Sequence, residues 1–590
     1  MATTTGRQGG RPLIQSTRGA IVAGHYLASE AGMAMFRAGG NAVDAATAAG
    51  FALTVVMPHQ NGLAGEAPML VQAAGADEPV AVNGNGTAPA AATLAAYTDL
   101  GLDVIPGDGL LPAVVPAAPA AWIALLRRFG TLRLADVLAP AIARAADGFP
   151  MYDALHNLIA ACADRFRRDW PSSAETFLTG PNGTAPPVGT IFRQPVLAAT
   201  LRALARADRR QRRRDSGLRA AFDAFYRGRI ARRIDRHCRR PVPDGTGTPH
   251  AGLLRADDLA AYDAQLERPV SAAYRGWRIY KCSSWCQGPA MLQTLKLLEG
   301  YDLPSMGHNT ADYVHTITEA MKLAYADREF YYGDPQFVRV PFRRLLSAAY
   351  ARRRRGLIDP AAASMDLRPG GMDPLPAKDV RAVNARFGEP SGPEHGDTTA
   401  VHAVDASGTI VAVIPSGGWL QSSPVIEGVG CPLGTRGQLF SLAAGHPNAP
   451  APGKRPRSTL TPSLAGRSRR RAQWAFGSPG GDCQDQWALQ FFLNVTAFGM
   501  SAQAAVEAPT FWSAHWPNSF YPRTAAPGVL HVERRVPAAV RTELRRRGHR
   551  LRVEAEFAGG NAMAVAIDPA TGVLRAAASP RYDAAYAMGW

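Results

Sequence analysis

Cysteine, lysine and long apolar runs are all scarce in this chain of 590 residues. Its six cysteines form no CxxC pair and no His-Cys cluster with metal-ligand spacing, so we expect no metal ion and no other cofactor. No segment approaches the run of about 18 apolar residues that a membrane-spanning helix needs, and Met1 to Ile21 is too polar for a signal peptide. We therefore expect a cytoplasmic enzyme with reduced thiols and no membrane partner.

Positive charge is abundant, but arginine carries nearly all of it. The formal net charge is +17, and only five of the 65 basic residues are lysines. Clustered cations can bind nucleic acids, because binding releases the counterions of the phosphates. Here the basic runs lie in four separate places, which favours solvated surface and predicts no nucleic-acid partner. These runs are residues 209–240, 352–355, 467–471 and 545–550.

Helical and strand-like patterns alternate along the chain, and 46% of its residues are hydrophobic, enough for a large core. The patterns predict helices over residues 27–38, 42–56, 119–129, 134–146 and 289–298, and an amphipathic helix over 310–330. They predict strands over residues 69–72, 80–83 and 274–282. A basic helical segment, residues 202–243, is expected at the surface, and residues 367–397 are expected to form a flexible tether.

The tether leads directly into two β-rich runs. Residues 398–404 and 409–414 flank Asp405-Ala-Ser-Gly408, a turn composition that predicts an antiparallel hairpin. The chain thus passes from a mobile loop into a core strand at Thr398.

Thr398 has the setting that a self-cleaving nucleophile requires. A strand can hold its hydroxyl rigidly against the flexible carbonyl of Asp397, so that an N-to-O acyl shift and hydrolysis cut the chain between the two residues. Thr398 would then be an N-terminus, whose α-amine has a reference pKa of about 7.7 to 8.0. That amine can act as general base for the hydroxyl of the same residue. Taken alone, however, an Asp-Thr-Thr sequence more often just begins a strand.

The motifs around Thr398 resemble those of the γ-glutamyltransferase family, in the same order, over roughly residues 18 to 585. The motifs before Thr398 include Gly39-Gly40-Asn41-Ala-Val-Asp44, Pro58-His59, Gln287-Gly288-Pro289, Tyr325-Ala-Asp327-Arg328 and Gly333-Asp334-Pro335. Those after it include Pro452-Gly453-Lys454-Arg455-Pro456-Arg457-Ser458-Thr459 and Gly477-Ser-Pro-Gly480-Gly481.

This resemblance implies an N-terminal-nucleophile hydrolase of α+β class. The implied fold is a four-layer αββα sandwich with two antiparallel sheets between helical layers. Self-cleavage would give a large subunit, residues 1–397, and a small catalytic subunit, residues 398–590. The two would remain together as a heterodimer, because both contribute strands to one core.

The resemblance also implies roles for individual residues. Thr398 would be the nucleophile, and Ser416 would hydrogen-bond to its amine or Oγ. Gly480 and Gly481 would supply the backbone amides of an oxyanion hole, a role that suits glycine because it lets the backbone approach the substrate closely. The Ser458-Thr459 pair would contact a substrate carboxylate.

Several positions depart from the family's pattern for binding glutamate. Leu94 stands where the family has an arginine for the α-carboxylate, and Gly418 stands where it has an asparagine. The acidic residue for the α-amine is replaced by Gln438 or Leu439. Arg436 lies close to a substrate contact of the family. It could grip a different carboxylate bidentately, or it could be a structural arginine that binds loop carbonyls.

Other reactive side chains are interpreted as structural. We expect His25, His59 and His402 not to act as bases, since the amine of Thr398 removes the need for one, and we expect Cys431 to be a buried hydrophobic residue. The carboxylates Asp257, Asp258, Asp482 and Asp485 are expected to cap helices or to lie at the surface.

The sequence therefore predicts an amidohydrolase or acyltransferase that acts through an ester of Thr398 on a small amide, which is not a standard γ-glutamyl donor. One alternative is a genuine γ-glutamyltransferase or glutathione hydrolase. An alternative of another class is a basic binding protein without catalytic activity.

Overall fold

Two seven-stranded antiparallel sheets lie face to face between helices in the computed structural model, which describes residues 10–371, 386–387, 398–467, 471–582 and 584–590. The first sheet has the order β23-β2-β13-β14-β3-β4-β9. Its strands are β2 (Gly19–Ala23), β3 (Met69–Gln72), β4 (Val80–Asn83), β9 (Gln265–Glu267), β13 (Val401–Asp405), β14 (Ile410–Val413) and β23 (Tyr586–Gly589).

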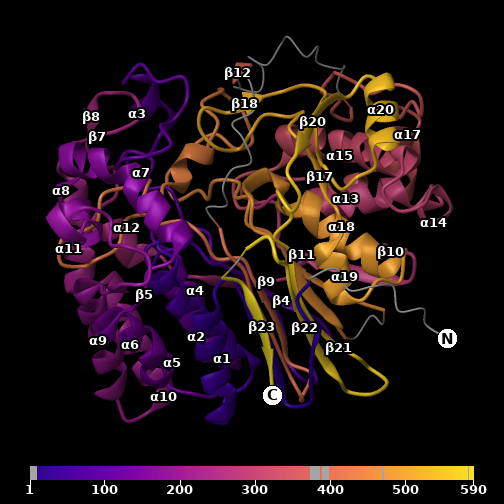
Figure 1. Ribbon diagram of the computed structural model, residues 1–590. Helices are drawn as coiled ribbons and strands as arrows, with labels where there is room; N and C mark the ends of the chain where they lie inside the picture. The colour runs from indigo at the N-terminus through magenta and orange to yellow at the C-terminus, as the bar shows by residue number, and fades with distance from the viewer. Residues whose placement is uncertain (1–9, 372–385, 388–397, 468–470, 583) are drawn as a thin grey trace.

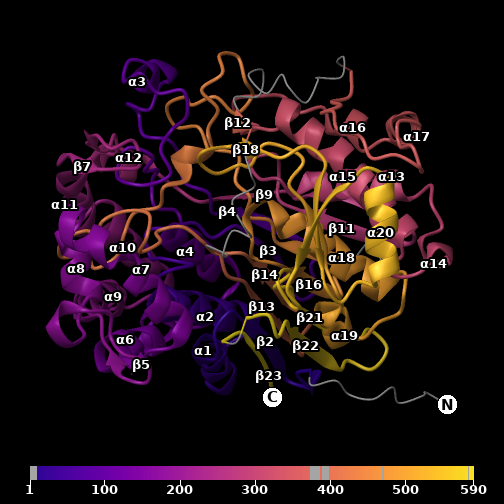
Figure 2. The same cartoon turned by 45° about the horizontal axis from the view of Figure 1, so that its top comes forward.

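The second sheet has the order β1-β22-β21-β16-β15-β11-β10. Its strands are β1 (Ile14–Ser16), β10 (Val270–Tyr274), β11 (Trp277–Lys281), β15 (Ser463–Gly466), β16 (Trp474–Gly477), β21 (Met563–Ile567) and β22 (Leu574–Ala578). In Figure 2, strands of both sheets lie between α1 and α2 on one side and α18 on the other. The predicted four-layer αββα sandwich is confirmed.

Helices α1 (Tyr26–Arg37) and α2 (Ala42–Val56) cover the outer face of the first sheet (Figure 1). Asn41 begins α2 with the expected capping box, in which its side chain accepts from the amide of Asp44 and the Asp44 carboxylate accepts from the amide of Asn41. Every residue of α2 is buried, because its many alanines allow the helix to pack closely on the sheet.

Helices α13 (Pro289–Leu298), α15 (Ala311–Tyr331) and α18 (Gln484–Thr496) form the opposite outer layer. The prediction that α15 is amphipathic is wrong, because neighbouring segments enclose most of its circumference and all residues from Tyr313 to Glu329 are buried. Its polar side chains are therefore held inside the protein by ion pairs and hydrogen bonds.

Between the sheets, alternating side chains meet in a separate core. Val22, Leu70 and Ala412 point inward from the first sheet. Leu464 and Val565 meet them from the second sheet, and all five are fully buried. Because successive side chains of a strand point to opposite faces, each sheet presents one face to this inner core and the other face to its helices.

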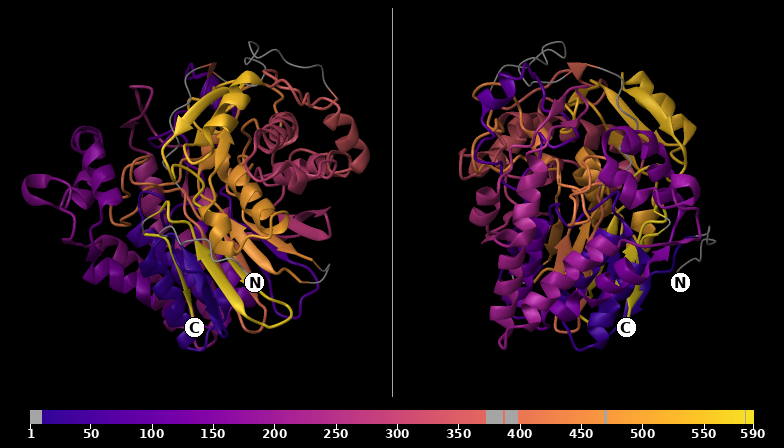
Figure 3. Two further views of the ribbon diagram at one scale, coloured as in Figure 1. Left: turned by 45° about the vertical axis from the view of Figure 1, so that its right-hand side comes forward. Right: turned by 90° about the vertical axis from the view of Figure 1, so that its left-hand side faces the viewer.

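A further block of helices lies beyond α1 and α2, on the same side of the strands in the left view of Figure 3. It comprises α4 (Ala118–Phe129), α5 (Leu134–Val137), α6 (Ala139–Asp147), α7 (Asp153–Asp169), α8 (Pro171–Phe177), α9 (Pro195–Arg209), α10 (Arg214–Tyr226), α11 (Arg229–Cys238) and α12 (Ala256–Ala261). The basic segment 202–243 belongs to this block. It is only partly exposed, because α10 and α11 each bury one apolar face.

The remaining named elements are short or peripheral. They include α3 (Leu94–Thr98), α14 (Leu303–Met306), α16 (Phe342–Leu345), α17 (Ala348–Arg355), α19 (Ala502–Glu507), α20 (Ala538–Arg546), β17 (Phe511–Ser513), β19 (Val529–Glu533) and β20 (Arg550–Glu554). No helix within the described ranges is both long and apolar enough to cross a lipid bilayer.

Two element predictions need correction. Residues 274–282 are not one strand, because Arg275 and Gly276 take positive φ angles of 46° and 83° and turn β10 into β11. The helix predicted over residues 134–146 is divided into α5 and α6, with Pro140 in the first turn of α6.

The predicted tether falls mainly on residues 372–385 and 388–397, which lie outside the described residues. Within it, β12 (Arg386–Phe387) pairs in parallel with β18 (Thr524–Ala525).

Both sheets combine strands from before and after Thr398. In the first sheet, β13 lies between β14 and β2, and in the second, β15 lies between β16 and β11. A cut before Thr398 would therefore leave two chains whose strands interleave.

Candidate active site

Thr398 and Ser416 lie together at one end of the hairpin formed by β13 and β14. The two residues form an isolated antiparallel bridge, and the Thr398 Oγ1 to Ser416 Oγ distance is 3.1 Å. Both residues are buried. The predicted hairpin is confirmed by its register, which pairs Val401 with Val413 and so brings the residues flanking both strands together.

A buried ion pair lies behind Ser416. Arg436 Nη2 donates to Ser416 Oγ at 2.6 Å, and Arg436 Nε donates to Glu66 Oε2 at 3.1 Å. The guanidinium carbon lies 4.9 Å from the centroid of the Trp419 ring. Since Arg436 already has a carboxylate partner inside the protein, these contacts favour the structural alternative for this residue.

Glu66 was not found by the sequence analysis, because a single glutamate in a glycine-rich loop carries no recognisable signal. Its backbone exchanges two hydrogen bonds with Ser416, which fixes the glutamate beside the hairpin. Burial raises the pKa of Glu66 to about 7, although Arg436 acts to lower it. Glu66, Arg436, Ser416 and Thr398 thus form a continuous chain of polar contacts.

Gly480 and Gly481 lie in the loop that follows β16, with φ angles of 118° and 51°. A Cβ on Gly480 would lie 2.3 Å from the ring of Trp487, so the backbone conformation and the close contact both require glycine there. Gly477, at the end of β16, packs against Ile414 and His402 of the hairpin that follows Thr398. The glycine loop and Thr398 therefore leave the sandwich at the same end.

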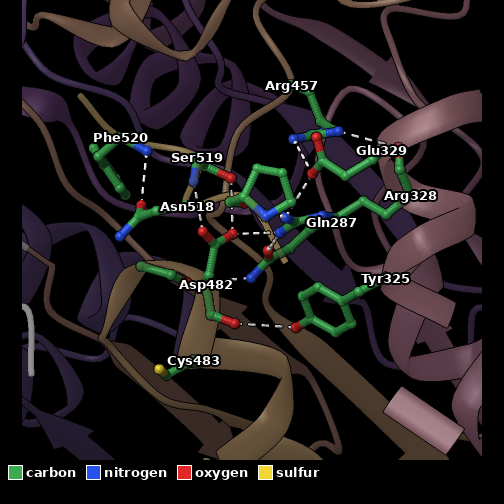
Figure 4. Close-up of polar contacts among 12 residues, drawn as sticks. Gln287, Tyr325, Arg328, Glu329, Arg457, Asp482, Cys483, Asn518, Ser519 and Phe520 are labelled. Carbon is green, nitrogen blue, oxygen red and sulfur yellow. Dashed lines mark hydrogen bonds and ion pairs between the residues drawn. The ribbon is translucent and has the colours of Figure 1, made fainter. Parts of the chain in front are cut away.

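An ion cluster supports this loop from behind (Figure 4). The carboxylate of Asp482 accepts from Arg328 and from the amide of Ser519. Arg328 also pairs with Glu329, to which Arg457 donates at 2.7 Å. The cluster joins the glycine loop to α15 and to the segment that leads into Ser458.

The expectation that Asp482 and Asp485 cap helices or lie at the surface is wrong. Both are buried in ion pairs, Asp482 with Arg328 and Asp485 with Lys281 at 2.7 Å. Buried carboxylates need such partners, which come from distant parts of the chain and leave no local sequence pattern. Asp258, in contrast, does cap a helix, since its side chain accepts from the amide of Arg255.

The other predicted substrate residues are also buried. Ser458 Oγ accepts from the amide of Leu460, whereas Thr459 Oγ1 has no hydrogen-bond partner within the described part of the chain. Gly418 has a φ of 66°, and a Cβ there would lie 3.2 Å from Gly65 N. Leu94 packs against the hydrophobic cluster that contains Phe440.

A cavity of about 980 Å³ opens beside the glycine loop, and Gly480 forms part of its wall. His25 and Met57 also line it. Met57 Sδ lies 3.9 Å from Thr399 Oγ1, so a residue of the cavity wall contacts the immediate neighbour of Thr398. The bond between Asp397 and Thr398 lies outside the described residues, because Asp397 does.

Two histidines that were expected to be structural, His25 and His59, line this cavity. His25 caps α1, since its Nδ1 accepts from the amide of Leu27 at 3.2 Å. His59 lines the cavity, and neither of its ring nitrogens has a hydrogen-bond partner within the described residues. Cys431 is buried, and burial raises the pKa of its thiol to about 12. In the described ranges, no group of three or more side chains could hold a metal ion.

The family profile for gamma-glutamyltranspeptidase matches residues 28–589, nearly the whole chain. The chain belongs to the γ-glutamyltranspeptidase family. It is 33% identical to the acylase ACY 1 proenzyme of Pseudomonas sp. strain SE83, over 96% of this chain and 93% of that protein. Other relatives include an oxamate amidohydrolase proenzyme of Klebsiella pneumoniae and a glutathione hydrolase proenzyme of Escherichia coli.

Solved structures of similar proteins match this chain over nearly its whole length. One, titled "Structure of LmbA2991HD", is 43% identical with a TM-score of 0.93, covering 99% of this chain and 100% of that chain. Another, a cephalosporin acylase from Bacillus halodurans, is 30% identical with a TM-score of 0.82, covering 100% and 99%. The protein is therefore an enzyme, a hydrolase of a family whose members are made as self-cleaving proenzymes.

Proposed function

We propose that this protein cleaves itself between Asp397 and Thr398 and then acts as an N-terminal-threonine amidohydrolase or acyltransferase. The observation that carries the proposal is the contact of 3.1 Å between Thr398 Oγ1 and Ser416 Oγ at the end of a core hairpin, beside the cavity that Gly480 lines. The full-length similarity to proenzymes supports processing into large and small subunits.

In the proposed reaction, the free α-amine of Thr398 takes the proton from Oγ1, which attacks the carbonyl carbon of the amide. The backbone amides of Gly480 and Gly481 stabilise the negative charge that develops on the carbonyl oxygen, a contribution of about 3 to 4 kcal/mol per donor in comparable sites. The α-ammonium of Thr398 returns this proton to the nitrogen of the substrate amide as the carbon-nitrogen bond breaks. The substrate amine leaves, and its acyl group remains as an ester on Thr398. Water hydrolyses this ester, or an acceptor amine takes the acyl group.

We assign Arg436 and Glu66 to positioning rather than to substrate binding. Arg436 donates to Ser416 Oγ, which lies 3.1 Å from Thr398 Oγ1, so we assign the hydrogen of the Ser416 hydroxyl to the contact with Thr398. Ser416 then donates to Thr398, which orients a lone pair of the nucleophile. Glu66 neutralises the buried guanidinium and keeps it in place.

The substrate is proposed to be an amide other than a standard γ-glutamyl donor. Leu94, Gly418, Gln438 and Leu439 offer no charged group for an amino-acid head, and the guanidinium of Arg436 is already paired with Glu66. The relatives include enzymes named for other amides, an acylase and an oxamate amidohydrolase, which supports this choice. Hydrolysis of a γ-glutamyl anilide at a rate typical of glutathione hydrolases would overturn it.

The proposal is tested by comparing the wild type with Thr398→Ala on a denaturing gel, followed by N-terminal sequencing of the smaller fragment. We expect two wild-type bands, the smaller beginning at Thr398, and one uncleaved and inactive band for the variant. Thr399→Ala is the matched control, because it removes the adjacent buried hydroxyl, and it should still be cleaved. Active wild-type protein that remains one continuous chain would contradict the mechanism.

A further inference from the structure

Several aromatic rings line the cavity beside Gly480. Its size, about 980 Å³, lies at the upper end of the range of roughly 300 to 1,000 Å³ for sites that enclose a drug-sized molecule. Tyr26, Tyr152, Trp487 and Tyr582 all line it. The ring of Trp487 packs directly on Gly480, so this aromatic surface continues up to the proposed oxyanion hole.

The described part of the cavity wall offers no free cation to a charged substrate. Arg581 is the one arginine among its described residues, and its guanidinium is paired with Glu533 and donates to the carbonyls of Val506 and Ala508. Among the described residues of the wall, Asp153 is the one carboxylate, and it lies at the exposed rim. A free carboxylate entering the cavity would therefore lose its hydration without gaining an ion pair.

The two histidines in the wall are neutral. Burial is the main cause that lowers the pKa of both His25 and His59 to about 3, and for His25 the proximity of His59 adds to it. The His59 ring is tilted by 58° to the ring of Tyr152, with centroids 6.1 Å apart. A neutral imidazole has one donor and one acceptor nitrogen, and in His59, which is only 7% exposed, neither is used by the described protein.

Resting on the proposed amidohydrolase function, we propose that this cavity binds a bulky, uncharged aromatic group attached to the scissile amide, with a polar edge of that group hydrogen-bonded to His59. Unpaired buried polar atoms are costly, and a ligand that pairs with them gains affinity. The aromatic walls supply stacking surface, and Gly480 places the amide carbonyl at the end of the cavity. The group can belong to the acyl half or to the amine half of the amide.

Two neutral probes distinguish these halves in the self-cleaved wild-type protein. In 2-naphthylacetamide the ring belongs to the acyl half, and in N-acetyl-2-naphthylamine it belongs to the amine half. Glutamine serves as the γ-glutamyl reference. Calorimetry gives the Kd of each compound, and mass spectrometry gives the KM of any that is hydrolysed. We expect at least one naphthyl compound to bind about tenfold or more tightly than glutamine, which corresponds to about 1.4 kcal/mol.

The contribution of His59 is tested with quinoline analogues, which keep the shape of naphthalene and add one ring nitrogen. The wild type should prefer the quinoline over the naphthalene form, and His59→Leu should abolish that preference. The matched control is His402→Leu. His402 is also buried and neutral with two unpartnered ring nitrogens among the described residues, but it does not line the cavity. It should keep the preference.

Glutamine binding as tightly as both naphthyl compounds would overturn the proposal for the cavity. A quinoline preference that is absent from the wild type, or that survives in His59→Leu, would overturn the role of His59. A different result would contradict the proposed amidohydrolase function. In that case Thr398→Ala would hydrolyse amides as the wild type does, whichever compounds the cavity binds.

Discussion

At the scale of single residues, Arg436 is held entirely inside the protein. Its guanidinium is enclosed by Trp419 and Phe520, with centroids 4.9 and 5.5 Å away, and is bonded to Glu66 and Ser416. A side chain so enclosed is expected to act on Thr398 through Ser416 rather than on a ligand from solution.

Replacing Arg436 should therefore reduce kcat more than it raises KM. For Arg436→Met we expect a fall in kcat of about 100-fold, because small displacements of a reacting group have effects of this size. Arg436→Lys should restore little, since one ammonium cannot reach Ser416 and Glu66 in the geometry of a planar guanidinium. Steady-state kinetics on any turned-over amide, with circular dichroism to confirm folding, provide the measurement. A change confined to KM would favour direct substrate binding by Arg436.

Glu66 should give the site a pH dependence of its own. Its pKa is raised to about 7, so the ion pair with Arg436 weakens as the pH falls through 7, and kcat should fall with it. In Glu66→Gln, the part of the fall in kcat that Glu66 causes near pH 7 should disappear. The remaining pH dependence of kcat should come from the titration of the Thr398 amine alone. Because the folded-state pKa lies above the usual 4.5, the contribution of protonated Glu66 to stability is complete below 4.5 and is lost as the pH rises to about 7. If kcat falls with decreasing pH in the same way in the wild type and in Glu66→Gln, Glu66 does not cause this pH dependence.

The resemblance to the family singled out Thr398, Ser416 and the glycine pair, and the structure brings the hairpin and the glycine loop to one end of the sandwich. It did not single out Glu66, and the expectation that Asp482 caps a helix or lies at the surface was wrong. Hydroxyl and glycine positions belong to local motifs that can be read from the chain. The partners of buried charges are set by tertiary packing, which no local pattern records.

At the scale of elements, the glycine loop is constrained by the helix that follows it. Gly480→Ala would force a side chain into the ring of Trp487 at a φ of 118°, so the loop must move. We expect kcat to fall about 100-fold or more through loss of an oxyanion donor. Gly499→Ala is the matched control, with a φ of 65° but open space around its Cβ position. It should cost only about 1 to 2 kcal/mol of stability and leave kcat unchanged.

The ion cluster on α15 should stabilise the glycine loop and the segment before Ser458 together. Burial alone would raise the pKa of Glu329, but Arg457, Arg328 and Arg523 lower it to about 2. Its stabilising effect is therefore complete above its usual value of 4.5 and is lost as the pH falls toward 2.

Glu329→Gln should destabilise the protein by about 3 to 5 kcal/mol near neutral pH, because it leaves buried guanidinium groups without their carboxylate. Urea unfolding at several pH values is the measurement, and the variant should lose less stability between about pH 5 and pH 3 than the wild type. Equal stability of the two proteins at pH 7 would show that the cluster contributes nothing net.

Element boundaries were predicted well where caps and periodicity were strong, as in α2 and α13, which match the predicted residues. The prediction failed at Arg275-Gly276, where a two-residue turn interrupts a continuous β-rich pattern. It also misjudged α15, because a helix enclosed by other segments can carry polar residues on every side when each has a partner.

At the scale of the whole molecule, interleaved strands should keep the two proposed subunits together. In both sheets, strands from before Thr398 pair with strands from after it, so separating the fragments would expose the core between the sheets. We expect the fragments to co-elute in gel filtration under native conditions and to separate only in denaturant. Elution of the smaller fragment alone in native buffer would contradict this expectation.

The place of β13 inside the first sheet also determines when the chain can mature. This strand pairs with β2, from near the start of the sequence, and β2 in turn pairs with β23, at its end. The strand that begins just after Thr398 is thus held between β14, which follows it directly, and β2, which comes from a distant part of the chain. Scission, if it depends on this support, would then report that distant segments have assembled, and chains that lack β2 should persist as intact precursors.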